Sequence, residues 1–168
     1  LERRPVCHRV MDEAMTEFRR FTGSPSNPHI DSPTKKGARV RQTIGEHIQS
    51  AYEKARGWDR LGIYLGHIYC PSPIVVDDGT PLPPDDTYGY APNTHPGSRA
   101  PHAWLEDGRS LLDLFGKNHV LLRLGRNPPD AASLTAAAAK RGVALDVHDI
   151  ASPEIATLYG CALALVRP

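Results

Sequence analysis

The chain has 168 residues, of which 40% are hydrophobic and 23% are charged, and its formal net charge is +1. This length and composition predict a globular protein with one well-buried domain and an additional helical segment. The small net charge argues against a dedicated nucleic-acid-binding protein, which normally carries a strong basic excess. No run of 18 apolar residues and no signal peptide occur in the sequence, so we expect a soluble, cytoplasmic protein without a membrane partner.

The cysteines argue against two further classes of site. Cys7, Cys70 and Cys161 are far apart, odd in number and without a C-x-x-C pair. This pattern is typical neither of a disulfide framework nor of a zinc site, and it fits a reducing compartment.

Two amphipathic helices are expected at the start of the chain, over residues 2–21 and 34–56, joined by a loop rich in Gly, Ser, Asn and Pro. Gly57 follows the second helix at a C-cap position. The apolar stripes are Val6, Val10, Ala14, Phe18 and Phe21 in the first helix, and Val40, Ile44, Ile48, Ala51, Tyr52 and Ala55 in the second. Each stripe needs a partner, and we expect part of that partner to lie outside this chain.

The middle of the chain is expected to be extended. Residues 61–69 and 74–76 are rich in β-branched and aromatic side chains, which predicts strands. Six prolines then fall within residues 81–101, and this density predicts a stiff crossing segment instead of a packed element. We therefore expect three regions: a helical segment (1–60), strands with the crossing segment (61–101) and a C-terminal domain (102–168).

The C-terminal domain shows an α/β alternation. Strands are predicted at residues 102–105, 119–124, 143–147 and 161–166, with a short strand or helical turn at 110–115. Helices are predicted after Asp130 and after Ser152, which can act as N-caps. A parallel βαβ core followed by a further helix and strand indicates an α/β fold of the thioredoxin-like type. The loop 125–130, where a thioredoxin would carry its reactive thiol, has no cysteine, which excludes thiol–disulfide exchange at that place.

Several motifs are more specific than this pattern. They are DDGT at residues 77–80, PGSRAPHAWL at 96–105, SLLDLFG at 110–116 and LYG at 158–160, the last followed by LALVRP. Together they resemble the C-terminal region of the FAD-dependent aromatic-ring hydroxylases of the phenol hydroxylase and dichlorophenol monooxygenase type. The resemblance is most specific over residues 72–168, and residues 2–6 are similar to the segment that closes the family's FAD domain.

The resemblance implies a parent enzyme that uses FAD and NAD(P)H to insert one oxygen atom of O₂ into an aromatic ring. The family's G-x-G-x-x-G fingerprint and its Gly-Asp contact to FAD are absent from this sequence. It follows that this chain should bind no cofactor and contain no catalytic or metal-binding residue of its own. The implied partners are the upstream FAD domain of the same polypeptide, an aromatic substrate and, as an option, a second copy in a homodimer.

The residues singled out by these motifs are Asp77, Asp78, Arg99, Pro101, His102, Trp104 and Asp113. One hypothesis has Arg99, His102 and Asp113 form a buried polar network or contact the missing FAD domain; the favoured alternative is that they brace the crossing segment. Asp77 and Asp78 could hold a metal ion with His95, but a turn is the better interpretation. A catalytic triad from His148, Asp149 and Ser152 is disfavoured because no G-x-S-x-G turn accompanies it.

Two functions remain in competition. The chain begins at Leu1 instead of Met and stops at Pro168 directly after an apolar run, so we expect a piece of a longer protein. In family members the chain continues with one more hairpin, which this C-terminal domain is expected to lack. The preferred hypothesis is the structural or dimerisation portion of an aromatic-ring hydroxylase, inactive by itself. The alternative is a free-standing thioredoxin-like binding or oligomerisation module without redox activity.

Overall fold

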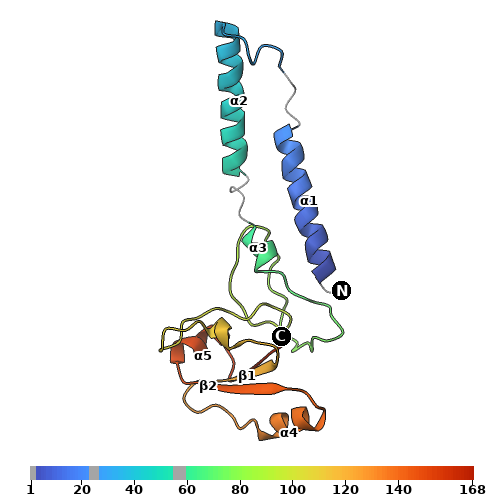
Figure 1. The fold of residues 1–168 in the computed structure, drawn as a ribbon, viewed down its shortest axis with the longest axis vertical. Coiled ribbons are helices and arrows are strands. Elements are labelled where there is room, and N and C mark those ends of the chain that lie inside the picture. Colours follow the sequence, from blue (N-terminus) through green and yellow to red (C-terminus); the bar gives the residue numbers. More distant parts are fainter. Residues whose placement is uncertain (1–2, 23–26, 55–59) are drawn as a thin grey trace. The chain divides into compact units, whose positions relative to one another are not determined.

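The computed structural model describes residues 3–22, 27–54 and 60–168 (Figure 1). The chain divides into two compact units. The helical unit comprises Leu1–His67 and Asp85–Tyr90, and the α/β unit comprises Ile68–Pro84 and Ala91–Pro168. Within the described residues, no helix combines the length and the apolar character needed to cross a membrane.

The helical unit contains α1 (Arg3–Thr22), α2 (Lys35–Lys54) and the single-turn helix α3 (Leu61–Tyr64). The first two confirm the helices predicted from apolar periodicity. In the first predicted stripe, Val6 and Val10 are half-buried while Phe18 is 58% exposed. The Phe21 side chain and Ala55 lie outside the described residues.

The strand predicted at residues 61–69 is wrong, because α3 forms there. A Cβ atom on Gly62 would lie only 1.5 Å from the carbonyl oxygen of Asp86, so glycine allows α3 to approach this backbone closely. Ile63 is completely buried. Packing against residues distant in the sequence thus overrides the strand preference of β-branched and aromatic side chains. The strand predicted at 74–76 is also absent.

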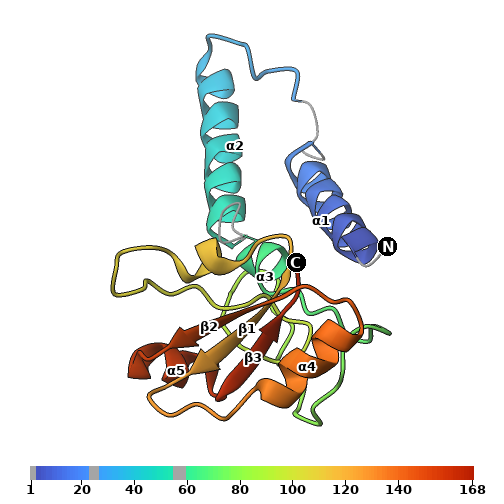
Figure 2. The same cartoon turned by 60° about the horizontal axis from the view of Figure 1, so that its bottom comes forward.

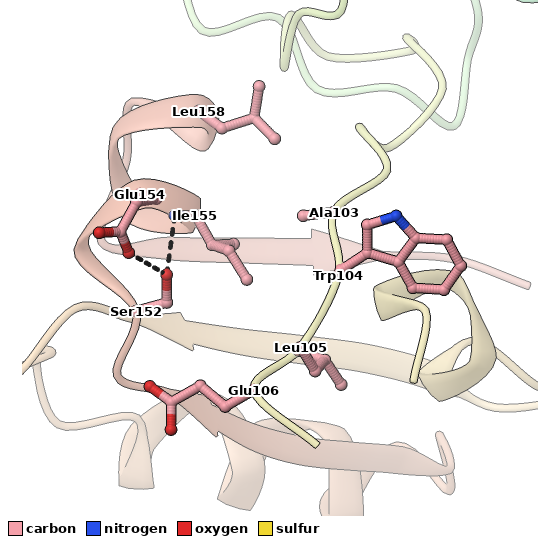
Figure 3. A pocket seen from close by; sticks show the side chains of 8 residues that line it. All are labelled: Ala103, Trp104, Leu105, Glu106, Ser152, Glu154, Ile155 and Leu158. Carbon is pink, nitrogen blue, oxygen red and sulfur yellow. Dashed lines mark hydrogen bonds between the residues drawn. The ribbon is translucent and has the colours of Figure 1, made fainter. Parts of the chain in front are cut away.

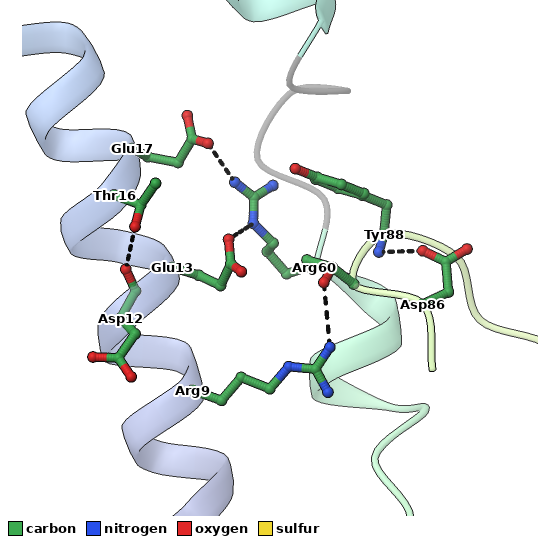
Figure 4. A network of polar contacts seen from close by, with 9 residues as sticks. Arg9, Asp12, Glu13, Thr16, Glu17, Arg60, Asp86 and Tyr88 are labelled. Carbon is green, nitrogen blue, oxygen red and sulfur yellow. Dashed lines mark hydrogen bonds and ion pairs between the residues drawn. The ribbon is translucent and has the colours of Figure 1, made fainter. Parts of the chain in front are cut away.

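A cluster of ion pairs holds the helical unit together (Figure 4). The Arg60 side chain is only 7% exposed; its Nη2 atom lies 3.2 Å from Oε1 of Glu17, and its Nε atom 4.0 Å from Oε2 of Glu13. The Arg60 guanidinium also lies 4.8 Å from the centre of the Tyr88 ring, a cation–π contact.

Residues 85–90 are packed, although the proline-rich pattern predicted an unpacked crossing segment. Arg9 of α1 donates hydrogen bonds to the Asp85 carboxylate at 2.8 Å and to the Thr87 hydroxyl at 3.2 Å. Together with the contacts of Gly62 and Arg60, these bonds place residues 85–90 against α1 and α3.

The α/β unit is built on a three-stranded sheet (Figure 2). Its elements are β1 (His119–Leu124), α4 (Ala132–Lys140), β2 (Leu145–Ile150), α5 (Pro153–Tyr159) and β3 (Leu163–Val166). The strand order is β2-β1-β3, with β1 parallel to β2 and antiparallel to β3. A parallel βαβ core followed by a helix and an antiparallel strand confirms the predicted thioredoxin-like fold.

The central strand explains the core. Because β1 has a neighbour on both edges and is covered on both faces, Val120, Leu121, Leu122 and Leu124 are all buried. Helix α5 begins as predicted: the Ser152 hydroxyl accepts a hydrogen bond from the Ile155 amide at 3.2 Å, and the helix ends at a left-handed glycine, Gly160.

The part of the α/β unit just before β1, residues 102–115, differs from the prediction. Residues 102–105 form no strand, and only an isolated bridge joins Trp104 to Ser110. The alternative weighed for residues 110–115, a helical turn, is confirmed as the 3-10 helix η1 (Leu111–Leu114). The last two strands, β2 and β3, begin two residues later than the sequence indicated.

Candidate functional site

The crossing segment is fixed to the C-terminal end of α5 at two points. The hydroxyl of Tyr159, a residue that is 2% exposed, donates a hydrogen bond to the Pro101 carbonyl at 2.9 Å. The Tyr159 carbonyl in turn accepts a hydrogen bond from the Thr94 hydroxyl at 2.7 Å. Since the buried phenol forms a hydrogen bond, the cost of removing its hydroxyl from water is offset, and these bonds orient the segment. Sequence analysis missed this role of Tyr159, because nothing in the sequence indicates a partner 58 positions away.

Side chains alternate along the segment that follows. Pro101 is buried, and Ala103 and Leu105 pack against the core. His102 and Trp104 point outward; Trp104 is 68% exposed, and the two rings meet edge to face with centroids 4.9 Å apart. The segment therefore has an inner row that joins the core and an outer row that is open to contact.

A hollow of about 370 Å³ lies between residues 103–106 and the first turns of α5 (Figure 3). Its floor is apolar, with contributions from Ala103, Ile155 and Leu158. Two carboxylates, Glu106 and Glu154, stand at its edge, and the Trp104 indole points away from α5.

The Glu154 carboxylate is oriented by its neighbour. The Ser152 hydroxyl donates a hydrogen bond to it at 2.7 Å, and this bond is the main reason why the pKa of Glu154 lies below its ordinary value. Arg126 lowers the pKa further by its positive charge. The group is therefore ionised at neutral pH and held in one direction.

Asp77 and Asp78 lie in a turn and do not form a metal site with His95 among the described residues. Asp77 accepts a hydrogen bond from the Gly79 amide, while Asp78 accepts one from the Thr80 amide and one from the Thr80 hydroxyl. The bonds from Thr80 lower the pKa of Asp78. The Nδ1 atom of His95 lies 2.9 Å from the Pro96 carbonyl oxygen. In the part of the chain that the structure describes, no three side chains of metal-binding type come together.

The hypothesis of a buried polar network of Arg99, His102 and Asp113 is wrong, because all three residues are exposed. Asp113 serves a local purpose: its carboxylate accepts a hydrogen bond from the Ser110 amide at 3.1 Å, completing a capping box for η1. Of the motif residues, His102 and Trp104 are in direct contact through their rings.

The remaining candidate chemistry finds no support. Asp149 pairs with Arg123 at 3.1 Å, and Ser152 caps α5, so two residues of the disfavoured triad have other partners. Cys7, Cys70 and Cys161 are free thiols, and partial burial raises the pKa of Cys161, which lowers its reactivity.

The fold and this arrangement define a thioredoxin-like α/β domain. Residues 93–168 match the family described as "aromatic-ring hydroxylase, C-terminal". The chain therefore carries, over these residues, the C-terminal domain of the aromatic-ring hydroxylases. This confirms the family expected from the motifs, whereas the phenol hydroxylase type stays a prediction.

Relatives of known function agree with this family. The chain is 31% identical to the FAD-dependent monooxygenase opdD of Penicillium oxalicum, in a match that covers 99% of this chain and 33% of that protein. Over 84 residues it is 36% identical to aklavinone 12-hydroxylase DnrF of Streptomyces peucetius, covering 48% of this chain and 16% of the relative.

Solved structures extend the likeness to the whole described fold. The rebeccamycin biosynthetic enzyme RebC with reduced flavin superposes with a TM-score of 0.79 at 38% identity, covering 99% of this chain and 30% of RebC. The flavin-dependent monooxygenase PieE, in complex with FAD and substrate, gives a TM-score of 0.64 at 25% identity, covering 99% and 34%. The chain thus spans about a third of the length of these relatives.

Proposed function

We propose that this chain is the C-terminal portion of an FAD- and NAD(P)H-dependent monooxygenase that hydroxylates an aromatic substrate, and that its own role is structural. The observation that carries the proposal is the match along 99% of the chain to flavin-dependent monooxygenases of which it forms only a third. In this arrangement the catalytic residues and the flavin belong to the rest of the polypeptide.

The described residues of this chain do not fit FAD. A flavin pyrophosphate needs a glycine-rich β–α turn whose backbone amides point at the phosphates. The β–α turn of the parallel pair here contains Pro128 and Pro129, which have no amide hydrogen. The hollow beside α5 carries Glu106 and Glu154, whose negative charges would repel a phosphate. No step of the hydroxylation is therefore assigned to this chain.

The helical unit supports a covering role. Met11, Met15 and Phe18 follow one face of α1 at spacings of four and three, and they are 60%, 43% and 58% exposed. A contiguous row of large apolar side chains at the surface marks an interaction site. We assign this face to contact with the catalytic part of the polypeptide; a homodimer is the second candidate for the same face.

The test compares this chain with the full gene product. We expect the gene product to be about three times as long, to bind FAD with a visible flavin absorbance and to oxidise NAD(P)H when an aromatic substrate is present. This chain alone should be colourless and leave FAD fluorescence unchanged in a titration. A gene product of this length without flavin would favour the free-standing binding module, and flavin binding by this chain alone would contradict the structural role.

A further inference from the structure

The hollow between residues 103–106 and α5 has two carboxylates at its edge, and neither forms an ion pair with the described residues. Glu106 makes no hydrogen bond or ion pair with any of the described residues, and the Glu154 carboxylate accepts hydrogen bonds from the Ser152 hydroxyl and from its own backbone amide. Arg126 acts on Glu154 through its charge but forms no ion pair with it. Figure 3 shows the Glu154 carboxylate above Ser152 and the Glu106 carboxylate below it.

The apolar floor of the hollow favours a ligand that has an apolar chain. It is formed by Ala103, Ile155 and Leu158, and Ile155 is itself buried in the core of the α/β unit. A ligand that satisfies floor and edge together must have an aliphatic chain that ends in a positive charge. Arginine and lysine side chains have this form, since they bury their methylene groups and keep the charged head at the edge. Arginine fits better, because its planar guanidinium can pair with carboxylates through several N–H groups at once.

Resting on the proposed function, we propose that this hollow receives an arginine side chain from the catalytic part of the same polypeptide and so fixes the α/β unit to it. Charge complementarity selects the cation. The proposed source of the arginine is the rest of the same polypeptide, because this sequence spans only about a third of the length of the matched relatives. The rest of the polypeptide is thus tethered to the α/β unit and present at high effective concentration.

The oriented state of Glu154 supports the assignment. The oxygen of the Ser152 hydroxyl accepts a hydrogen bond from the Ile155 amide and so caps α5. The same hydroxyl donates a hydrogen bond to the Glu154 carboxylate at 2.7 Å. The carboxylate is thereby held in place before a partner arrives, so less side-chain freedom is lost on docking. Glu106 follows Leu105, whose side chain packs against the core, and it is therefore carried by a fixed backbone.

The experiment uses the full gene product and this chain, both studied by hydrogen–deuterium exchange. Peptides that cover residues 103–106 and 152–158 should exchange roughly tenfold more slowly in the full gene product, which is the ratio expected for a partly buried pair of charge-assisted contacts. The double variant Glu106→Gln/Glu154→Gln should lose most of this protection. The matched control, Asp77→Asn/Asp130→Asn, removes the same charge from the same unit and should leave the protection unchanged.

Each other result overturns the inference. Equal exchange in both proteins means that nothing docks in the hollow, and protection that survives the double glutamine variant means that the docking is not cationic. Protection of this chain alone that grows with its concentration, together with dimers in sedimentation, means that a second copy is the occupant. Flavin absorbance of the same sample separates the two proposals: a gene product without flavin refutes the proposed function, whereas a yellow protein with an unprotected hollow refutes only the arginine site.

Discussion

The two units of the chain differ in what they bury. Apart from Ile63, all the buried hydrophobic residues of the described chain lie in the α/β unit, where most of them form one core around β1. The buried polar residues, Glu17 and Arg60, both lie in the helical unit. A unit with one fully buried large apolar side chain and a cluster of ion pairs has less hydrophobic stabilisation of its own than a unit with an apolar core. The α/β unit thus has a core of its own, whereas α1 of the helical unit leaves Met11, Met15 and Phe18 exposed.

The largest effect is expected from the core of the α/β unit. Leu122 is completely buried in β1, and Leu122→Ala should lower the free energy of unfolding by about 3–5 kcal/mol. Urea unfolding followed by circular dichroism measures this change. Leu165→Ala on β3, where the side chain is 57% exposed, is the control and should cost far less. Similar losses for both variants would mean that the α/β unit lacks the core described.

The ion-pair cluster provides the next test. Glu17→Gln removes the nearer carboxylate from the buried guanidinium of Arg60, and should lower the free energy of unfolding of the helical unit by about 2 kcal/mol. Amide exchange in α1 should rise while exchange in β1 stays constant. Glu46→Gln, at an exposed position of α2, is the matched control. An equal rise of amide exchange in α1 and β1 would show that the two units unfold together, which would contradict the difference in their stability.

Removal of one hydroxyl should have a smaller effect. Tyr159→Phe deletes the hydrogen bond to the Pro101 carbonyl and should lower the free energy of unfolding by about 1 kcal/mol. Exchange of amides in residues 94–105 should increase most. Tyr64→Phe, at a side chain that is 57% exposed, should be neutral. If the amides of this segment exchange at wild-type rates in Tyr159→Phe, the hydroxyl does not anchor the segment.

The smallest effect is a pH dependence of the helical unit. Burial, assisted by the positive charge of Arg9 and opposed by Asp85, lowers the pKa of His67. Since the unfolded chain takes up a proton at the ordinary histidine pKa of about 6.5, stability is fully present above that pH and declines as the pH falls through the lower pKa of the folded state. The urea midpoint of the helical unit should follow this direction, and His67→Gln should flatten it. A midpoint that rises on acidification in this range would contradict the assignment.

The sequence contains those parts of the fold that are encoded locally. Helices α1 and α2 follow from apolar periodicity, and α5 follows from Ser152, Pro153 and Gly160, whose chemistry starts and ends a helix within a few residues. The strand error at 61–69 arose because the conformation depends on Gly62 meeting the backbone of Asp86, a contact between distant residues that no local pattern reveals.

The candidate site was less accessible to sequence analysis. The motif pointed to the correct segment and to the pair His102 and Trp104, but Asp113 is used in a local capping box. The hollow combines Glu106 with Glu154, which are 48 positions apart and are brought together only because Tyr159 fixes the crossing segment to α5. A signal could have come from the Ser-Pro-Glu start of α5, which places a carboxylate in the first turn.

The central claim is that this chain is a structural portion of a larger flavoenzyme, and that the rest of the enzyme covers the exposed face of α1. Methionine oxidation tests this claim most directly. The two methionines of the chain, Met11 and Met15, both lie on that face. Dilute hydrogen peroxide should convert both to sulfoxides rapidly in this chain alone, and peptide mass spectrometry of the flavin-bearing gene product should show them protected until the protein is unfolded. Equal oxidation rates in the two folded proteins would contradict the account.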